Sequence, residues 1–264
     1  MESAGATMKL NDTGLPIFIK VLLLGDSGTG KTGALAALVK AGYELRILDY
    51  DNKISGGILP IVIKRDCPDK MGTVEFEPLR DKLKSSPMGP VPDGLPSAYT
   101  KGLALLDKWS DGSVPGTWGP KKVLVVDSLT FLADAAFNWV KAMNPSVKDP
   151  RQWFYTAQQA VENTISLMTA DTFATNLVVI AHINWQNRPD GTMKGFPASV
   201  GQALGPTIPT YFENMAQCQI VAGKRTIQTA PTVLLDLKNP AAFRMLPTLP
   251  IETGLGDFFK SLKE

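Results

Sequence analysis

The sequence has little of what metal centres and disulfide-bonded folds are built from. It contains one histidine, His182, and two cysteines, Cys67 and Cys218, which stand far apart and form no C-x-x-C pattern. This scarcity excludes metal sites made of several histidines, zinc-binding cysteine clusters and a disulfide framework. No apolar run approaches the length of a membrane span, and the N-terminus lacks the apolar stretch of a signal peptide. We therefore expect a cytoplasmic protein that does not contact a membrane.

The chain also lacks a strong charge of either sign. Its 264 residues carry a formal net charge of +2, so any contact with nucleic acid must come from a local patch. Hydrophobic residues make up 44% of the sequence, which supports a large core. The length is that of one large α/β domain, or of a domain with insertions.

The most specific feature is a complete phosphate-loop motif, G-x-x-x-x-G-K-[ST], which reads GDSGTGKT over residues 25–32. An apolar, strand-like stretch over 17–24 precedes it, and a run of helix formers over 33–40 follows it. Strand, loop and helix are the context that this motif requires, because the loop's N–H groups bind phosphate at the start of the helix. The residues predicted to bind a nucleoside triphosphate are Gly25, Asp26, Ser27, Gly28, Thr29, Gly30, Lys31, Thr32 and Gly33.

Two residues of the motif have individual roles. We expect Lys31 to reach the terminal phosphates and the Thr32 hydroxyl to bind Mg²⁺. Asp127 ends an apolar strand over 123–127 and is predicted to orient Mg²⁺ through its water shell. The alternative is that Asp127 is simply the N-cap of the helix that follows.

Polar residues also end two other predicted strands. Asp49 and Asp51 end the strand over 45–51, on one face and at the carboxyl edge where open α/β sheets bind ligands. We expect Asp51 to position and polarise the water that attacks the γ-phosphate; the alternative is a solvated strand end. His182 follows the strand over 177–181 and is predicted to contact the γ-phosphate, unless the local backbone satisfies it.

The remaining pattern predicts the fold class. Strands are also expected at 61–63, 217–222 and 225–230, the last two joined at Gly223-Lys224 as a hairpin, and helices at 97–109, 128–143, 150–170 and 258–262. Alternating strands and helices predict an α/β protein with a mostly parallel central sheet, helices on both faces and a C-terminal antiparallel hairpin.

The chain is predicted to divide into a flexible N-terminal arm (1–16), a core (17–240) and a C-terminal tail that packs on the core (241–264). Within the core we expect an irregular insertion over 52–120. Its proline-rich stretch, 85–96, is either a docking strand for a partner or a linker.

A long segment over 184–210 shows no periodicity and is expected to be a mobile loop. It combines cations that can follow phosphates with aromatic rings that can stack on bases, as proteins that bind single-stranded DNA do. The residues predicted to contact nucleic acid are Trp185, Arg188, Lys194 and Phe196. The alternative is an active-site lid or a contact between subunits.

These motifs, in this order, resemble the RecA-type recombinase core. The stretch over 47–51, ILDYD, resembles the RecA strand that ends in the catalytic glutamate, and VVDS over 125–128 matches the family's Walker-B strand. Ile180-Ala181-His182-Ile183 lies where the family has its phosphate-sensing glutamine, which a mobile DNA-binding loop follows. The resemblance spans residues 16–240. It is closest to the short, bacteriophage-encoded RecA-like P-loop ATPases of single-strand annealing and recombination, which belong to the phage AAA-type proteins and carry a histidine after the fourth strand.

The chain departs from the RecA pattern in two ways. Asp51 lies where the family has glutamate. Because its side chain is shorter, either hydrolysis is slower or the strand must lie closer to the nucleotide. The large accessory domains of the family are missing, so unaided strand exchange is not expected.

The resemblance implies ATP and Mg²⁺ as cofactors and hydrolysis at subunit interfaces, where a neighbour supplies a cation to the γ-phosphate. Arg225, Lys238 and Lys224 lie on the segment where related proteins carry that cation; the alternative for each is a solvated charge. It further implies single-stranded DNA as a partner, self-association into a ring or filament, single-strand-binding or recombination proteins as further partners, and a bacterial host cytoplasm.

The leading hypothesis is therefore a DNA-stimulated, Mg²⁺-dependent ATPase that binds single-stranded DNA in phage recombination, annealing or repair. Three alternatives remain open: a hexameric helicase or translocase, a small-molecule kinase, and an ATP-gated scaffold that does not hydrolyse ATP.

Overall fold

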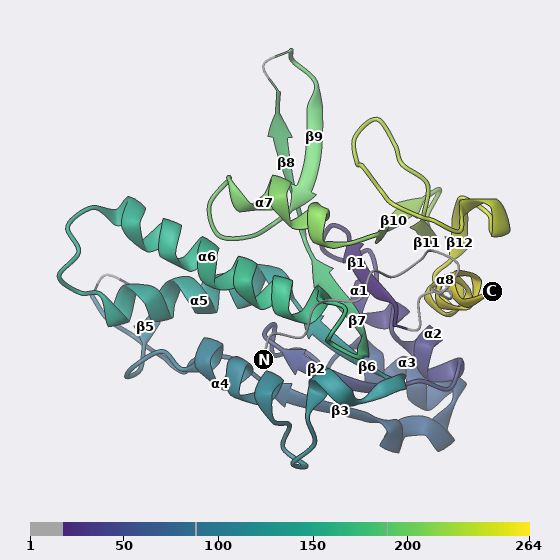
Figure 1. Cartoon of the computed structure of the whole chain (residues 1–264), viewed down its shortest axis with the longest axis horizontal. Helices are drawn as coiled ribbons and strands as arrows, with labels where there is room; N and C mark the ends of the chain where they lie inside the picture. The colour runs from purple at the N-terminus through teal and green to yellow at the C-terminus, as the bar shows by residue number, and fades with distance from the viewer. Residues whose placement is uncertain (1–17, 88, 189) are drawn as a thin grey trace, which may run out of the picture.

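The computed structural model of the chain describes residues 18–87, 89–188 and 190–264. Its centre is an eight-stranded sheet with the order β12-β11-β10-β1-β7-β6-β2-β3 (Figure 1). The six strands from β10 to β3 in this order run parallel, whereas β11 and β12 pair antiparallel. The strands of this sheet are β1 (Lys20–Leu24), β2 (Glu44–Asp49), β3 (Val74–Pro78), β6 (Gly119–Asp127), β7 (Thr175–Ala181), β10 (Asn214–Val221), β11 (Lys224–Gln228) and β12 (Thr248–Pro250).

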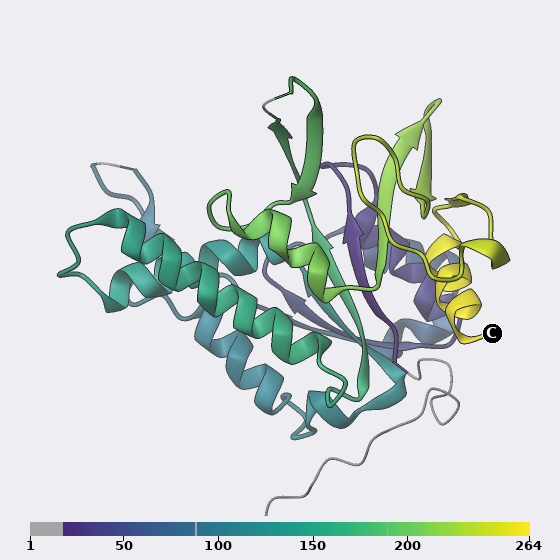
Figure 2. The same cartoon turned by 45° about the horizontal axis from the view of Figure 1, so that its top comes forward.

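Helices cover both faces of the sheet. The α-helices are α1 (Lys31–Ala34), α2 (Ala36–Lys40), α3 (Ile58–Asp66), α4 (Ala98–Asp107), α5 (Leu129–Met143), α6 (Pro150–Thr169), α7 (Leu204–Thr207) and α8 (Gly254–Lys263). Shorter 3₁₀ turns are η2 (Pro68–Thr73), η3 (Pro115–Thr117), η4 (Ile208–Tyr211) and η5 (Ala242–Arg244). Helices α4, α5, α6 and α7 contribute to the core on one face, and α1, α2, α3 and α8 to the core on the other (Figures 1 and 2).

The two cores follow from the alternation of side chains along each strand. In β6, Leu124 and Val126 face the first core, whereas Val123 and Val125 face the second. Because both faces are covered, central strands such as β7 are buried along their whole length. The expected fold class, a mostly parallel sheet between helices with an antiparallel extension, is therefore confirmed.

One short predicted strand is wrong. Residues 61–63 lie inside α3, not in a strand. Their β-branched composition favoured a strand, but Leu59 and Ile63 are spaced by one helical turn and are both buried. Pro60 lies in the first turn of α3, where a missing N–H group costs no helical hydrogen bond.

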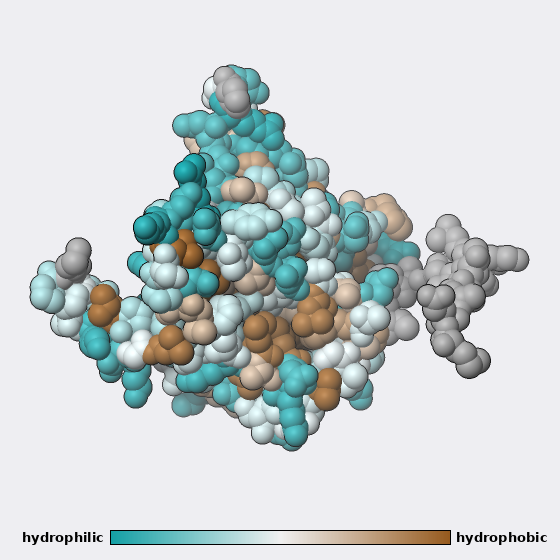
Figure 3. Space-filling view, turned by 60° about the vertical axis from the view of Figure 1, so that its left-hand side comes forward, coloured by the Kyte–Doolittle hydropathy of each residue, from teal (hydrophilic) through white to brown (hydrophobic). Residues whose placement is uncertain are grey.

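The segment 184–210, expected to be an aperiodic loop, contains a second hairpin. Strands β8 (Ile183–Asn187) and β9 (Met193–Pro197) pair antiparallel and project from the body of the molecule (Figures 1 and 2). The Gly195 N–H group donates to the Leu234 carbonyl at 2.8 Å, so the middle of β9 is held by a segment far along the chain. The projecting end is mainly hydrophilic on the face that Figure 3 shows.

The other expected hairpin is confirmed as β10 and β11, with the turn shifted by one residue to Ala222 and Gly223. Both residues have positive φ, as two-residue hairpin turns require. A third, short pair is formed by β4 (Leu83–Lys84) and β5 (Val91–Pro92), inside the proline-rich region.

Three segments of the expected division can be compared with the structure. The arm over 1–16 lies outside the described residues. The segment over 52–120, expected to be irregular, contains α3, β3 and α4, and the segment over 241–264 contains β12 and α8, of which α8 packs against α2. Across the described ranges, none of the helices is long and apolar enough to cross a membrane.

Candidate nucleotide site

The phosphate loop joins β1 to α1 and has the backbone that its glycines permit. Gly28 and Gly30 have φ of 80° and 95°, in the left-handed region that favours glycine. At Gly25 a Cβ atom would lie 2.6 Å from the carbonyl oxygen of Cys218 on the neighbouring strand β10. This close approach explains why the first position of the motif must be glycine.

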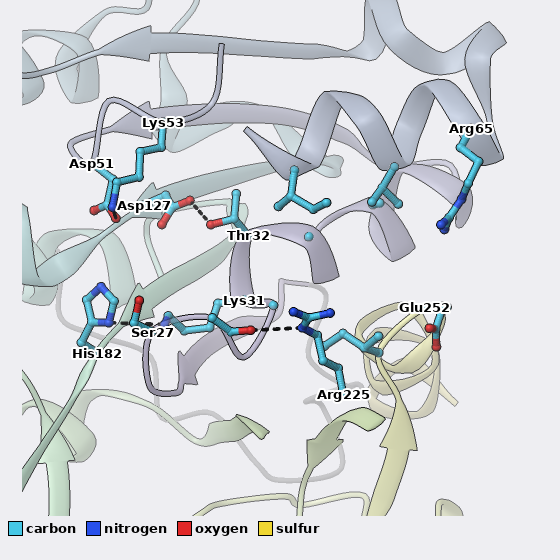
Figure 4. Close-up of a pocket in the computed structure, with 17 residues that line it drawn as sticks. Ser27, Lys31, Thr32, Asp51, Lys53, Arg65, Asp127, His182, Arg225 and Glu252 are labelled. Carbon is cyan, nitrogen blue, oxygen red and sulfur yellow. Dashed lines mark hydrogen bonds and ion pairs between the residues drawn. The ribbon is translucent and has the colours of Figure 1, made fainter. Parts of the chain in front are cut away.

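A pocket opens around this loop (Figure 4). The residues that line it are Ser27, Gly28, Gly30, Lys31, Thr32, Gly33, Ala36, Asp51, Lys53, Ile58, Val62, Arg65, Asp127, His182, Arg225, Ile251 and Glu252. The residues Gly25, Asp26 and Thr29 do not line the pocket, but they belong to the same loop and position the residues that do.

Lys31 lies at the centre of the site. Its Nζ atom donates to the carbonyl oxygens of Gly25 at 2.8 Å and Asp26 at 2.9 Å, and it lies 3.4 Å from His182 Nδ1. Burial lowers the pKa of Lys31, with nearby carboxylates acting in the opposite direction. Burial also lowers the pKa of His182, and the Lys31 charge lowers it further. His182 therefore faces Lys31 as a neutral imidazole at neutral pH.

Thr32 and Asp127 meet where a metal ion is expected. The Thr32 hydroxyl donates to Asp127 Oδ2 at 2.7 Å, so Asp127 is not the N-cap of α5. Burial raises the pKa of Asp127 to about 7, and the charges of Asp51 and Asp49 add to the effect of burial. A hydroxyl and a buried carboxylate side by side are oxygen ligands of the kind that a hard divalent cation such as Mg²⁺ prefers.

Asp49 and Asp51 have different surroundings. They do not share one strand face as expected, because β2 ends at Asp49. The Asp49 carboxylate accepts hydrogen bonds from the N–H groups of Lys53 and Ile54 at 3.2 and 3.0 Å. Asp51 lies in the loop beyond the strand, and its Oδ1 accepts a hydrogen bond from the Ser128 hydroxyl at 2.7 Å. Asp51 lines the pocket, whereas Asp49 shapes the loop.

The three basic residues expected near the γ-phosphate lie in different places. Arg225 lines the pocket of its own chain, and its Nε atom donates to the Gly28 carbonyl at 3.1 Å. In Figure 4 it lies on the opposite side of Lys31 from Asp51. Lys238 is not brought to the pocket, because its ammonium donates to the carbonyls of Pro209 and Phe212. Lys224 is exposed at the start of β11.

The residues expected to contact nucleic acid all lie on the β8–β9 hairpin. Arg188 is exposed, and Trp185 and Phe196 are half-buried. Lys194 is only 8% exposed and forms an ion pair with Asp236, so its charge is already neutralised within the chain. A contact of Lys194 with a phosphate backbone would therefore require this ion pair to open. Trp185 also donates from its indole N–H to Asp26 Oδ1 at 3.3 Å.

Several pocket residues belong to no motif that a sequence displays. Lys53, Ile58 and Arg65 follow Asp51 in the chain, and Ile251 and Glu252 come from the turn after β12. Proximity in sequence to Asp51 is a weak signal for the first group. The sequence offers no signal for Ile251 and Glu252, because they reach the phosphate loop only through the pairing of β10, β11 and β12.

Comparisons with known proteins identify a family for the chain. A search of curated proteins finds no relative that matches the chain. Solved structures with a similar fold include the RadB recombinase, with 15% sequence identity, 83% of each chain covered and a TM-score of 0.44. Another is a prototypical ATPase from the type III secretion system of pathogenic bacteria, with 12% identity, 78% of this chain and 52% of that chain covered and a TM-score of 0.42. The profile of the AAA domain family matches residues 17–241, and the chain belongs to this family.

Proposed function

We propose that this protein is a Mg²⁺-dependent ATPase that binds single-stranded DNA and acts in DNA recombination, annealing or repair, in the manner of the phage RecA-like proteins. One observation carries the proposal: Lys31, Thr32, Asp51, Asp127 and His182 line a single pocket beside a phosphate loop. Membership of the AAA domain family supports nucleotide binding at this pocket.

The chemistry follows from the surroundings of these side chains. Asp51, oriented by Ser128, accepts a proton from water as the water oxygen attacks the γ-phosphorus. The bond from the γ-phosphorus to the bridging oxygen breaks, its electron pair leaves with ADP, and the products are ADP, inorganic phosphate and a proton. Lys31 stabilises negative charge on the phosphates. Thr32 and Asp127 would hold Mg²⁺, which when bound would supply positive charge that neutralises part of the charge of the phosphates.

The position of His182 supports a link from the nucleotide to DNA. It lies 3.4 Å from Lys31, and β8 begins at the next residue. A change at the terminal phosphate can therefore move the base of the β8–β9 hairpin. Trp185 reinforces this link, because it contacts the phosphate loop directly.

The β8–β9 hairpin is the proposed contact for single-stranded DNA, with Arg188 exposed beyond the end of β8 and the half-buried Trp185 and Phe196 on its strands. Arg188 supplies a cation, and Trp185 and Phe196 supply rings on which bases stack. Because Lys194 is paired with Asp236, the hairpin offers little net charge. We infer that several subunits in a ring or filament present their hairpins together, so that weak contacts add along one strand.

A titration of labelled single-stranded DNA by fluorescence polarisation tests the proposal. We expect binding that tightens with a non-hydrolysable ATP analogue, and ATP turnover that rises when single-stranded DNA is added. The variant Lys31→Ala serves as the control. It should show neither the tighter DNA binding with the ATP analogue nor the ATP turnover that DNA stimulates. Absence of DNA binding with and without the analogue would contradict the DNA part of the proposal.

A further inference from the structure

The loop after β2 is a rigid turn that brings two side chains to the pocket. The Asp49 carboxylate binds the N–H groups of Lys53 and Ile54, and the Asp51 N–H group donates to the Asp127 carbonyl at 3.1 Å. Between these anchors Asn52 has a φ of 54°, in the left-handed region. With its backbone fixed in this way, the loop presents both Asp51 and Lys53 to the pocket (Figure 4).

Lys53 reaches toward the end of the pocket that holds Asp51. Its Nζ atom lies 4.0 Å from Asp51 Oδ2 and 5.9 Å from the centre of the Phe131 ring on α5. The Arg80 guanidinium lies 5.6 Å from the same ring centre and donates to the Asp51 carbonyl at 3.4 Å. The side chain of Lys53 is 70% exposed, so its ion pair with Asp51 is weak and easily exchanged for another anion.

The distribution of charge in the pocket indicates which group the Lys53 ammonium can bind. Asp51 and Asp127 lie at this end of the pocket, and a γ-phosphate would add further negative charge. Burial and the Lys31 charge lower the pKa of His182, and in Figure 4 Arg65 and Arg225 lie on the far side of Lys31. Among the described residues that line the pocket, Lys53 is therefore the cation that joins Lys31 at the Asp51 end.

We propose that Lys53 binds the γ-phosphate within its own subunit and stabilises the charge that develops on the phosphoryl oxygens during hydrolysis. It thereby supplies in cis the positive charge that the resemblance to RecA assigns to a neighbouring subunit. When Lys53 turns to the phosphate, Asp51 loses a competing partner and is free to accept the proton of water. This inference rests on the proposed ATP hydrolysis.

The first test compares Lys53→Met with Lys64→Met, an exposed lysine on α3 that does not line the pocket. Loss of a transition-state cation should lower kcat about 100-fold in Lys53→Met, whereas Lys64→Met should match the wild type. Lys53→Met should also bind a non-hydrolysable ATP analogue more weakly while binding ADP, which lacks the γ-phosphate, as the wild type does. Lys53→Arg should recover part of the turnover, because the charge is kept.

The second test separates action within a subunit from action between subunits. Lys53→Met is mixed with Asp51→Asn, which lacks the proposed base but carries Lys53. Action in cis predicts that the mixture has no more activity than the two proteins measured apart. Recovery of turnover in the mixture would show that Lys53 acts across an interface and would overturn the inference.

The outcomes also distinguish this inference from the proposed function. A wild-type protein that hydrolyses ATP together with an unchanged Lys53→Met variant would overturn the role of Lys53 alone. A wild-type protein that does not hydrolyse ATP would overturn the proposed function, and the role of Lys53 with it.

Discussion

Trp185 and Asp26, 159 residues apart in the sequence, are joined by a hydrogen bond of 3.3 Å from the indole N–H to the carboxylate. Trp185 lies on β8, in the projecting hairpin, and Asp26 lies in the phosphate loop. A side chain of the proposed DNA-binding element therefore contacts the element that binds the nucleotide. Such a contact can couple the two sites only if the nucleotide changes it.

Replacing Trp185 with Phe tests this coupling. Phe keeps an aromatic ring for stacking but removes the N–H donor, so the variant should bind single-stranded DNA without nucleotide much as the wild type does. The gain in affinity caused by an ATP analogue, which is about 5- to 150-fold for typical coupled sites, should shrink. Trp153→Phe is the matched control, because the Trp153 indole, near the start of α6, donates to the Asn144 carbonyl at the end of α5. Equal gains in all three proteins would show that the hydrogen bond does not couple the sites.

Arg188 and Lys194 lie on the same hairpin but should differ in their response to salt. Each phosphate contact with a single strand contributes about 0.7 to the slope of log affinity against log salt concentration. Arg188→Gln should therefore reduce that slope by about 0.7. Lys194→Met should leave it unchanged, because Asp236 already neutralises Lys194. The prediction fails if Lys194→Met lowers the slope as Arg188→Gln does.

Lys20 provides a test of stability against pH. Its ammonium donates to the carbonyls of Met168, Phe173 and Thr175, and burial lowers its pKa to about 8, against a weaker opposing effect of Asp171. An unfolded chain keeps the ordinary lysine pKa of about 10.4. Between these values the unfolded state binds more protons, so the free energy of unfolding should rise with pH.

Urea unfolding of the wild type and of Lys20→Met at several pH values between about 7.5 and 9.5 isolates this effect, because all other groups titrate alike in both proteins. The stability of the wild type relative to the variant should increase with pH, by less than about 1.4 kcal/mol per pH unit, the limit for one proton. If the relative stability does not change with pH, or falls as pH rises, the pKa of Lys20 is not lowered in the folded protein.

The sequence predicts well those parts of the site that depend on neighbours in the chain. The phosphate loop could be placed because its flanking strand and helix are adjacent to it. Asp127 and His182 could be placed because each directly follows an apolar strand, and parallel strands end at one edge of the sheet. The mostly parallel sheet follows from the same alternation of strands and helices.

Other features depend on contacts between distant segments, and no local pattern reveals them. The β8–β9 hairpin is held at the middle of β9 by the Leu234 carbonyl, and Lys194 is neutralised by Asp236. The Lys238 ammonium donates to carbonyls of the segment before β10. The sequence places Asp49 and Asp51 on one strand face, and only the turn that follows β2 gives them different partners.

The most direct test of the account is ATP turnover by the wild type, Asp51→Asn and Asp49→Asn in the presence of Mg²⁺. The account predicts that Asp51→Asn binds nucleotide normally but releases phosphate about 10²- to 10⁴-fold more slowly, because the general base is lost. Asp49→Asn should instead be less stable by about 1–3 kcal/mol, since a charged acceptor of two backbone N–H groups is weakened. Phosphate release by Asp51→Asn at the wild-type rate would contradict the mechanism proposed for this pocket.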